Sequence, residues 1–307
     1  GGGGRAGPVT SRAGGGGHDG RGPPPRHDDG SPSRALVLGG GGATGIAWLG
    51  GLIAGLREHG IDLREADTVI GTSAGSVVGA HLRLDTSEGS GGEAPMSTEP
   101  IKDLGRASGG AGLTLIRALV HPSRAGSRAL IGRISTGART GSEEAFVELI
   151  AGTLKGVPWP DRPLLVTAID VEDGTAMVFG RDSGVPLERA LAASCSVPGT
   201  FPPVTIGGRR YMDGGVRSVA NVDLAAGHDR VLVLAPIPLS FRPADAPARQ
   251  ARALWPNART LVIAPDEATR RVIGYKFLDM TRTGAAMEAG HAQAQREAER
   301  IARTWQG

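Results

Sequence analysis

The chain has 307 residues, enough for one substantial hydrophobic core, and it carries 34 basic against 31 acidic side chains. Only 4% of the residues are aromatic and only three of the cationic side chains are lysines, so we expect no nucleic-acid partner. Cys195 is the single cysteine, which excludes an intramolecular disulfide and a metal site built from several thiolates. A cytoplasmic chain fits this cysteine usage.

Residues 1–33 are rich in Gly, Pro, Arg and Asp and have hardly any apolar side chains. Such a segment buries too little surface to offset its ordering entropy, so we expect a disordered tail, followed by one catalytic domain over residues 34–307. The tail also lacks the apolar segment of a secretory signal. Since no stretch has the roughly 18 apolar residues of a membrane span, any membrane contact should be peripheral.

The first predicted element is a buried parallel strand over residues 35–38, a short apolar run. A glycine-rich turn at 39–42 and a helix over about 45–59 follow. A second strand at 68–70 then leads through a tight turn into another helix. This repeated order of strand, loop and helix predicts an α/β fold with a parallel sheet covered by helices.

Residues 85–156 form an insertion that begins with a polar, glycine-rich loop and continues as a patchily helical stretch, amphipathic over 143–154. A lid over an acyl chain and ordinary outer helices are equally good interpretations. Further apolar runs predict strands at 164–169, 176–179, 209–212, 231–235 and 261–264. The last stretch, 276–304, has the pattern of one long amphipathic helix.

Ser73 is the candidate nucleophile. It lies in the pattern Gly-x-Ser-x-Gly, formed by Gly71-Thr72-Ser73-Ala74-Gly75. This spacing lets a strand turn abruptly into a helix and pushes the serine hydroxyl out of the turn. The pattern is weak by itself in a chain with 50 glycines. Its position between an apolar strand and a helical pattern favours a nucleophile over an ordinary glycine-rich turn.

A second glycine-rich turn, residues 39–45, also lies between a strand and a helix N-terminus. Successive backbone N–H groups in such a turn can point together at an anion, and the helix dipole favours negative charge there. The anion could be the oxyanion of an acyl-transfer reaction or a phosphate group. No Gly-Lys-Ser/Thr follows, which excludes a P-loop.

A nucleotide-binding α/β protein is therefore one alternative. Gly40, Gly42 and Gly45 fit the dinucleotide-binding pattern, and Asp62 or Glu65 lies near the expected position of the ribose-binding acid. This interpretation leaves the candidate nucleophile without a role.

Ser73 needs a base, because an unassisted hydroxyl is a poor nucleophile at neutral pH. Asp213 follows the predicted strand 209–212, which places it at the same sheet edge as Ser73. An ordinary turn aspartate is the other interpretation of Asp213. A Ser-Asp-His hydrolase using His228 is a further alternative, although His228 precedes a strand and should lie at the opposite edge. His291 falls within the last helix and should be a surface residue.

An aspartate that acts without a histidine is a feeble base, since its ordinary pKa is about 3.9. Burial beside apolar walls would raise that pKa and ease proton abstraction. A dyad of Ser73 and Asp213 therefore requires an apolar pocket, which is also what an acyl-chain substrate requires.

Three blocks of the chain, taken together, resemble the patatin-like phospholipase family. They cover about residues 36–225 and consist of Leu36-Val37-Leu38-Gly39-Gly40-Gly41-Gly42-Ala43-Thr44-Gly45, Gly71-Thr72-Ser73-Ala74-Gly75-Ser76, and Ala193-Ser194-Cys195-Ser196-Val197-Pro198-Gly199-Thr200-Phe201-Pro202-Pro203 leading to Asp213-Gly214-Gly215. Each block is weak alone, but all three in this order are specific.

The resemblance implies a three-layer α/β/α sandwich around a mainly parallel sheet, and a Ser73–Asp213 dyad that hydrolyses lipid acyl esters through an acyl-enzyme. The activity would be that of a phospholipase A, a lysophospholipase or a lipase-like esterase. The substrate would be a lipid or acyl ester, with no metal and no cofactor. Backbone N–H groups would form the oxyanion hole, and further glycines would support the turns. The hole residues are Gly40, Gly41, Gly42 and Ala74, and the supporting glycines are Gly45, Gly71, Gly75, Gly214 and Gly215.

Two positions qualify this resemblance. Thr44 stands where the family usually has Arg or Lys, which removes a charged partner for a phosphate or an oxyanion. Plain acyl-ester hydrolysis is therefore expected more firmly than phospholipid hydrolysis. Cys195 lies in the third block, where we expect a small packed side chain and not a second nucleophile. A non-catalytic member that binds lipid without turnover is the remaining alternative.

Overall fold

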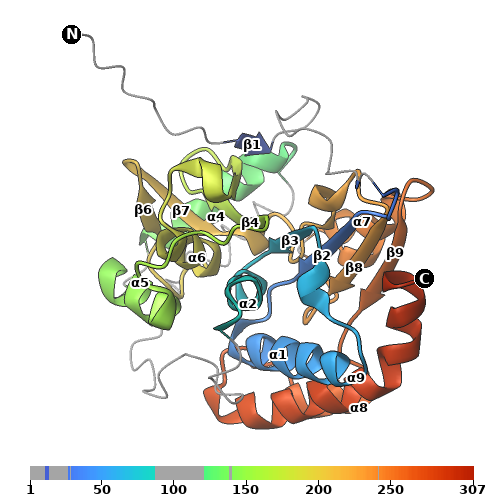
Figure 1. Ribbon diagram of the computed structural model, residues 1–307. Coiled ribbons are helices and arrows are strands. Elements are labelled where there is room, and N and C mark those ends of the chain that lie inside the picture. The colour runs from blue at the N-terminus through green and yellow to red at the C-terminus, as the bar shows by residue number, and fades with distance from the viewer. Residues whose placement is uncertain (1–10, 14–26, 28, 87–120, 138–139, 241) are drawn as a thin grey trace.

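Figure 1 shows the computed structural model, which describes residues 11–13, 27, 29–86, 121–137, 140–240 and 242–307. The described strands are β1 (Ser11–Ala13), β2 (Arg34–Leu38), β3 (Thr68–Gly71), β4 (Leu164–Asp170), β5 (Ala176–Phe179), β6 (Val204–Ile206), β7 (Arg209–Asp213), β8 (Arg230–Leu234) and β9 (Arg259–Ile263). The described α-helices are α1 (Gly42–Glu58), α2 (Ala74–Leu84), α4 (Arg124–Gly137), α5 (Glu143–Ala151), α6 (Leu187–Cys195), α7 (Pro247–Ala253), α8 (Glu267–Ile273) and α9 (Thr283–Trp305).

In the described part of the chain, the nine strands form one sheet with the main order β1-β5-β4-β3-β2-β8-β9. The five strands from β4 to β9 along this path are parallel to their neighbours. Beyond β4 the pairing is antiparallel, through β5 and β1 on one side and through β7 and β6 on the other. The predicted α/β architecture is confirmed, with a parallel centre and an antiparallel extension that the strand pattern alone did not reveal.

The parallel strands are buried on both faces because their side chains alternate between two hydrophobic layers. Leu36 and Leu38 of β2 pack into the larger core together with Trp48 of α1. Val37, on the opposite face of β2, packs into a second core that includes Ala251 of α7. Helices thus cover both faces of the sheet, and Figure 1 shows α9 lying along α1 on the outside of the larger core.

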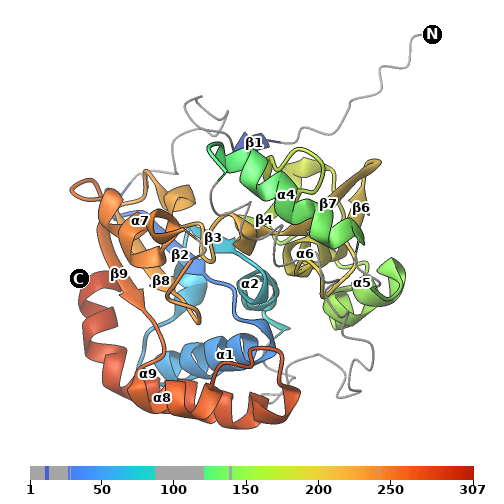
Figure 2. The same cartoon turned by 180° about the vertical axis from the view of Figure 1, so that it is seen from behind.

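Helix α4 covers the region where β4 and β7 meet, as Figure 2 shows. A side chain at Gly132 would come within 2.2 Å of the Val171 carbonyl, so the helix rests directly on the chain that leaves β4. The Ser135 hydroxyl lies 3.9 Å from the sulfur of Met212 in β7. Helix α4 therefore forms a wall beside the end of β7, which carries Asp213.

Part of the N-terminal segment differs from the expected disordered tail. Residues 11–13 form β1 and pair antiparallel with β5. Ser33 is buried, and its N–H and hydroxyl both donate hydrogen bonds of 2.8 Å to the Asp229 carboxylate. Backbone pairing and a buried hydrogen bond offset the ordering entropy at these places. Residues 1–10, 14–26 and 28 lie outside the described residues.

The expected insertion over 85–156 contains α4 and α5, while its residues 87–120 and 138–139 lie outside the described residues. Helix α5 is fastened to the body of the protein: the ring of Phe146 stacks on Phe201 at 4.7 Å, and the Glu143 carboxylate accepts a 2.7 Å hydrogen bond from the Thr205 N–H. These contacts favour an outer helix for α5. A lid function for the insertion stays a prediction.

Candidate active site

Ser73 occupies the turn between β3 and α2, in the strand–turn–helix context that the sequence predicts. Its backbone has φ 53° and ψ −123°, a left-handed conformation that is strained for a residue with a side chain. Gly75 allows the turn, since a Cβ there would lie 2.0 Å from the Leu38 carbonyl oxygen. The turn is therefore a place where the fold holds a serine hydroxyl out of a tightly packed backbone.

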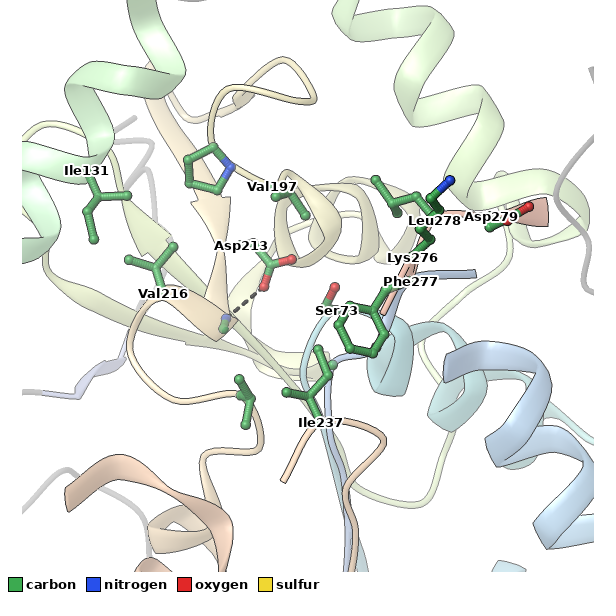
Figure 3. Close-up of a pocket in the computed structure, with 16 residues that line it drawn as sticks. Ser73, Ile131, Val197, Asp213, Val216, Ile237, Lys276, Phe277, Leu278 and Asp279 are labelled. Atoms are coloured by element: carbon green, nitrogen blue, oxygen red, sulfur yellow. Dashed lines mark hydrogen bonds between the residues drawn. The ribbon is translucent and has the colours of Figure 1, made fainter. Parts of the chain in front are cut away.

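Asp213 lies near this turn because β3 and β7 both pair with the same edge of β4. Gly71 at the end of β3 pairs with Val166, and Asp213 at the end of β7 pairs with Ala168. Because β5 occupies the other edge of β4, β3 and β7 meet end to end along one edge. Two residues of a strand span about 6.6 Å, so the ends of β3 and β7 lie close together. Figure 3 shows the Ser73 hydroxyl and the Asp213 carboxylate turned toward one another.

The environment of the Asp213 carboxylate alters its acidity. Burial raises the pKa of Asp213 to about 6, above its ordinary 3.8, although hydrogen bonds from the Gly215 N–H and from Ser73 favour the ionised form. The Gly215 N–H donates to Asp213 Oδ1 at 2.7 Å. This carboxylate is therefore a much stronger base than an exposed aspartate, yet it is still ionised at neutral pH.

Polar side chains that the sequence analysis did not identify support both candidate residues. The Ser73 N–H donates a 2.9 Å hydrogen bond to the Ser194 hydroxyl of α6. Beside the turn, the Thr72 and Thr167 hydroxyls lie 3.0 Å apart, and the Asn221 side-chain amide donates to Thr72 at 3.0 Å. The network is buried and joins β3, β4 and the chain after Asp213, which fixes their relative positions.

The glycine turn after β2 offers fewer free donors than expected. The Gly40 N–H donates to the Val219 carbonyl at 2.7 Å, so in this conformation it is engaged and not free to meet an oxyanion. The N–H groups of Gly41, Gly42 and Ala74 have no acceptor among the described residues. Gly41 and Gly42 precede or begin α1, and Ala74 begins α2, where backbone N–H groups have no partner within the helix.

Gly41, Gly42, Ser73 and Asp213 line one cavity of about 910 Å³. Figure 3 shows its lining, to which Ser73 and Asp213 contribute the candidate catalytic side chains. Its other walls are largely apolar and come from five separate parts of the chain: Ile131, then Val197 and Pro198, then Val216 and Val219, then Ile237, and finally Phe277 and Leu278. The apolar pocket that the Ser–Asp hypothesis requires is therefore present.

One wall of the cavity corrects the prediction of a helix over 276–304. Helix α9 begins only at Thr283, and residues 276–279 form an irregular segment that lines the cavity. Gly274, with φ 68°, ends α8, and Asp279 caps the short helical turn that follows. Both residues are sequence signals for a break, but the apolar periodicity continued across them. Sequence analysis therefore missed Phe277 and Leu278 as cavity residues.

Thr44 contacts this same segment. It is fully buried in α1, and its N–H and hydroxyl lie 3.2 and 3.4 Å from the Phe277 carbonyl oxygen. Thr44 is not among the residues that line the cavity. In this chain, the position therefore holds the cavity wall in place and does not supply a charge to a ligand.

The histidines and acids of the two alternative sites are not brought to Ser73 or to the glycine turn. Both ring nitrogens of His228 are engaged, with the Ala225 carbonyl at 3.1 Å and the Thr68 hydroxyl at 3.0 Å. Thr68 begins β3 whereas Ser73 follows its end, so roughly 10 Å of strand separates them. His291 pairs with Glu58 on the outer helices.

The acids of the nucleotide hypothesis also lie at the amino end of the sheet. Asp62 binds the neighbouring Arg64, and Glu65 pairs with Arg34, the first residue of β2. A ribose-binding acid would need to lie near the glycine turn at the other end of β2. The structure therefore does not assemble a dinucleotide site.

Cys195 is buried at the end of α6, beside the candidate dyad. Its burial, together with the nearby Asp213 carboxylate, raises the pKa of the thiol well above its ordinary range. A thiol held in its neutral form is a packed side chain and a poor nucleophile. Among the described residues, no group of three or more His, Cys, Asp or Glu side chains has the arrangement of a metal site. None of the described helices is long and apolar enough to span a membrane.

Comparison with known structures finds distant similarity. VipD of Legionella pneumophila matches with a TM-score of 0.41 and 13% identity, covering 90% of this chain and 69% of VipD. The ExoU–SpcU complex of Pseudomonas aeruginosa matches with a TM-score of 0.36 and 18% identity, covering 90% and 52%. Human GIVD cytosolic phospholipase A2 matches with a TM-score of 0.36 and 14% identity, covering 90% and 59%.

Sequence relatives are closer. Uncharacterized NTE family proteins of Mycobacterium bovis and Mycobacterium tuberculosis are each 30% identical over 226 residues, which cover 72% of this chain and 52% of each relative. The chain thus spans about half the length of the curated relatives it matches. The family model described as patatin-like phospholipase matches residues 36–226, which include every residue of the candidate dyad and its glycine turns. The resemblance carried by the three sequence blocks is confirmed, and the chain belongs to the patatin-like phospholipase family.

Proposed function

We propose that this protein is a serine acyl-ester hydrolase that acts on lipids through Ser73, Asp213 and an acyl-enzyme. Family membership supports lipid-ester hydrolysis as the class of activity. One observation carries the finer proposal: Asp213, whose pKa is raised to about 6, and the strained Ser73 face one apolar cavity. A base of that strength, a serine held out of its turn and an apolar site suit acyl transfer.

In the first step, Ser73 Oγ attacks the carbonyl carbon of the ester while its proton passes to the Asp213 carboxylate. The electron pair of the carbonyl bond moves to the oxygen, which becomes an oxyanion. The N–H groups of Gly41, Gly42 and Ala74 are the available donors for that charge. Removal of one such donor typically lowers turnover by about 10²–10³.

The tetrahedral intermediate then collapses and breaks the bond to the alcohol, which takes the proton held by Asp213. The acyl group remains on Ser73 as an ester. A water molecule repeats the sequence: Asp213 accepts its proton, the acyl carbon is attacked, and the fatty acid leaves as Ser73 regains its proton. Asp213 thus acts as base and acid in both halves of the reaction, without a histidine.

The cavity favours an acyl chain over a charged group as the part of the substrate held inside. Apart from Asp213, the charged residues that line it within the described part of the chain are Lys276 and Asp279, which lie together on the segment after α8. Thr44 is uncharged, and its hydroxyl contacts the Phe277 carbonyl. We therefore propose the acyl ester of a lipid as the substrate class and assign no head group.

The test uses the variants Ser73→Ala and Asp213→Asn with a short-chain p-nitrophenyl ester. Each variant should lose roughly 10³-fold or more in turnover while it keeps its folded circular dichroism spectrum. A fluorophosphonate probe should label the parent protein at Ser73, with the labelled peptide identified by mass spectrometry. Labelling at another serine, or near-parental turnover in either variant, would falsify the proposal. Saturable lipid binding without any turnover by the parent would instead identify a non-catalytic member.

A further inference from the structure

Two loops that line the cavity also expose large apolar side chains to solvent. Tyr275 is 96% exposed and directly precedes the cavity residue Lys276. Leu239 is 73% exposed and lies two residues beyond the cavity residue Ile237. Val272, at the end of α8, is 37% exposed. We call Leu239, Val272 and Tyr275 the rim patch.

The rim patch leaves apolar surface in contact with water, most of all at Tyr275 and Leu239. Moving a large apolar side chain from water to an apolar environment is favourable. Apolar side chains that gather on one exposed surface are typical of a protein–protein or membrane interaction site. An aromatic side chain with a polar tip, such as Tyr275, suits the boundary between lipid head groups and acyl chains.

The charge around the patch indicates what covers it. Residues 267–282, which include Val272 and Tyr275, carry four cationic and two acidic side chains, a net charge of +2. The acids are already paired: Glu267 binds Arg271, and Asp279 binds Arg282. A surface that combines exposed apolar side chains with excess positive charge is complementary to a bilayer that contains anionic lipid.

We propose that the rim patch docks on an anionic lipid surface and places the mouth of the cavity against it. An acyl chain then passes from the bilayer into the cavity along Phe277 and Leu278 without crossing water. The docking surface is inferred from the exposed residues and their charge. That the bound molecule is a substrate rests on the proposed lipid hydrolysis.

The chain offers a matched control in Trp255. It is an aromatic residue that is 72% exposed, close to the 73% of Leu239, but it lies between α7 and the start of β9. That position is at the amino end of the parallel strands, whereas Ser73 follows the carboxyl end of β3. A general effect of removing an exposed aromatic side chain would appear equally at Trp255.

The experiment measures sedimentation of the protein with phosphatidylcholine vesicles, with and without phosphatidylglycerol. Ser73→Ala serves as the background, so that no lipid is consumed. On anionic vesicles, Tyr275→Ser and Leu239→Ser should each lower the partition coefficient on the order of fivefold or more. Arg270→Gln should lower it about fivefold on anionic vesicles only. Trp255→Ser should leave it unchanged.

The proposal is overturned if the background protein does not bind anionic vesicles, or if Trp255→Ser and Tyr275→Ser have equal effects. With Ser73 intact, Tyr275→Ser should hydrolyse a water-soluble short-chain ester at the parental rate but lose activity on vesicles. Vesicle binding without any esterase activity would contradict the proposed function alone. Esterase activity with unchanged vesicle binding in Tyr275→Ser and Leu239→Ser would contradict the docking surface alone.

Discussion

The hydroxyl of Ser194 accepts a hydrogen bond of 2.9 Å from the backbone N–H of Ser73. Ser73 has a positive φ, so its turn persists only because its surroundings hold it there. Ser194 belongs to α6, 121 residues later in the chain, and is fully buried. This bond links the block at residues 193–203 to the block at residues 71–76 and holds the backbone of Ser73 in position.

Replacement of Ser194 by Ala should therefore affect both stability and turnover. The buried Ser73 N–H would lose its acceptor, which typically costs about 1–3 kcal/mol in the free energy of unfolding. Relaxation of the turn should lower kcat while KM changes little. Ser196→Ala is the control: it also removes a buried hydrogen bond, from its hydroxyl to the Pro202 carbonyl at 2.7 Å, but not one to Ser73. Equal kcat values in the two variants would contradict a positioning role.

The rate should depend on pH through Asp213. Its pKa of about 6 means that the carboxylate is ionised above pH 6 and protonated below it. Since only the ionised form accepts a proton, kcat/KM for a short-chain ester should be level above pH 7. It should fall about tenfold per pH unit below the pKa. A pH–rate profile that stays level down to pH 4.5 would show that another group is the base.

The same raised pKa predicts a stability effect of Asp213→Asn. Because the pKa of Asp213 lies above its ordinary 3.8 in the folded protein, the folded state binds the proton more tightly, and the free energy of unfolding falls as pH rises between about 4 and 6. Above pH 6 this penalty is complete and amounts to up to about 3 kcal/mol. Asp213→Asn should remove the penalty, so the inactive variant should have a higher Tm than its parent at pH 8. At pH 4 the two should melt together, as thermal denaturation would show.

Gly42 should not tolerate a side chain. Its φ is 59°, and a Cβ would lie 2.5 Å from the carbonyl oxygen of Phe277, the residue that Thr44 also holds. Gly42→Ala should displace this cavity wall and one candidate oxyanion donor, lowering turnover on the order of a hundredfold or more. Gly50→Ala is the matched control within α1, since nothing lies within 4 Å of its added Cβ. It should keep full activity and raise the free energy of unfolding by up to about 1 kcal/mol.

His228 should prove structural. Its two ring nitrogens are used at the amino end of the sheet, so His228→Gln should keep the parental kcat. Loss of buried hydrogen bonds should lower the free energy of unfolding by about 1–3 kcal/mol. Steady-state kinetics at a temperature where the variant is folded would separate the two effects. A thousandfold loss of kcat there would restore the Ser-Asp-His hypothesis.

Features set by local spacing were predictable from the sequence. The turn at Ser73 follows from its flanking glycines and neighbouring elements, and the position of Asp213 follows from its place at the end of a strand. Features set by distant partners were not. The acceptor that engages the Gly40 N–H is the Val219 carbonyl, 179 residues away in sequence, and no local pattern announces it. The buried role of Ser194 is hidden for the same reason.

The prediction for residues 276–282 failed for a different reason. Apolar residues there continue the spacing of the following helix, so periodicity alone extends the helix across them. In the structure, Phe277 and Leu278 satisfy the same apolar requirement by lining a cavity. Periodicity indicates that a side chain avoids water but not what it packs against. Only the break signals at Gly274 and Asp279 distinguish a continued helix from an irregular segment that lines a cavity.

The proposed catalytic residues and this cavity wall come from separate stretches of the chain. Ser73 and Asp213 lie within residues 36–226, which the family model covers, whereas Phe277 and Leu278 lie about 50 residues beyond its end. Under the proposed function, substitutions in the later stretch should therefore change which lipids fit the cavity and leave Ser73 and Asp213 in place. Exchange of residues 274–282 between relatives should therefore transfer substrate preference without any change to the two proposed catalytic residues.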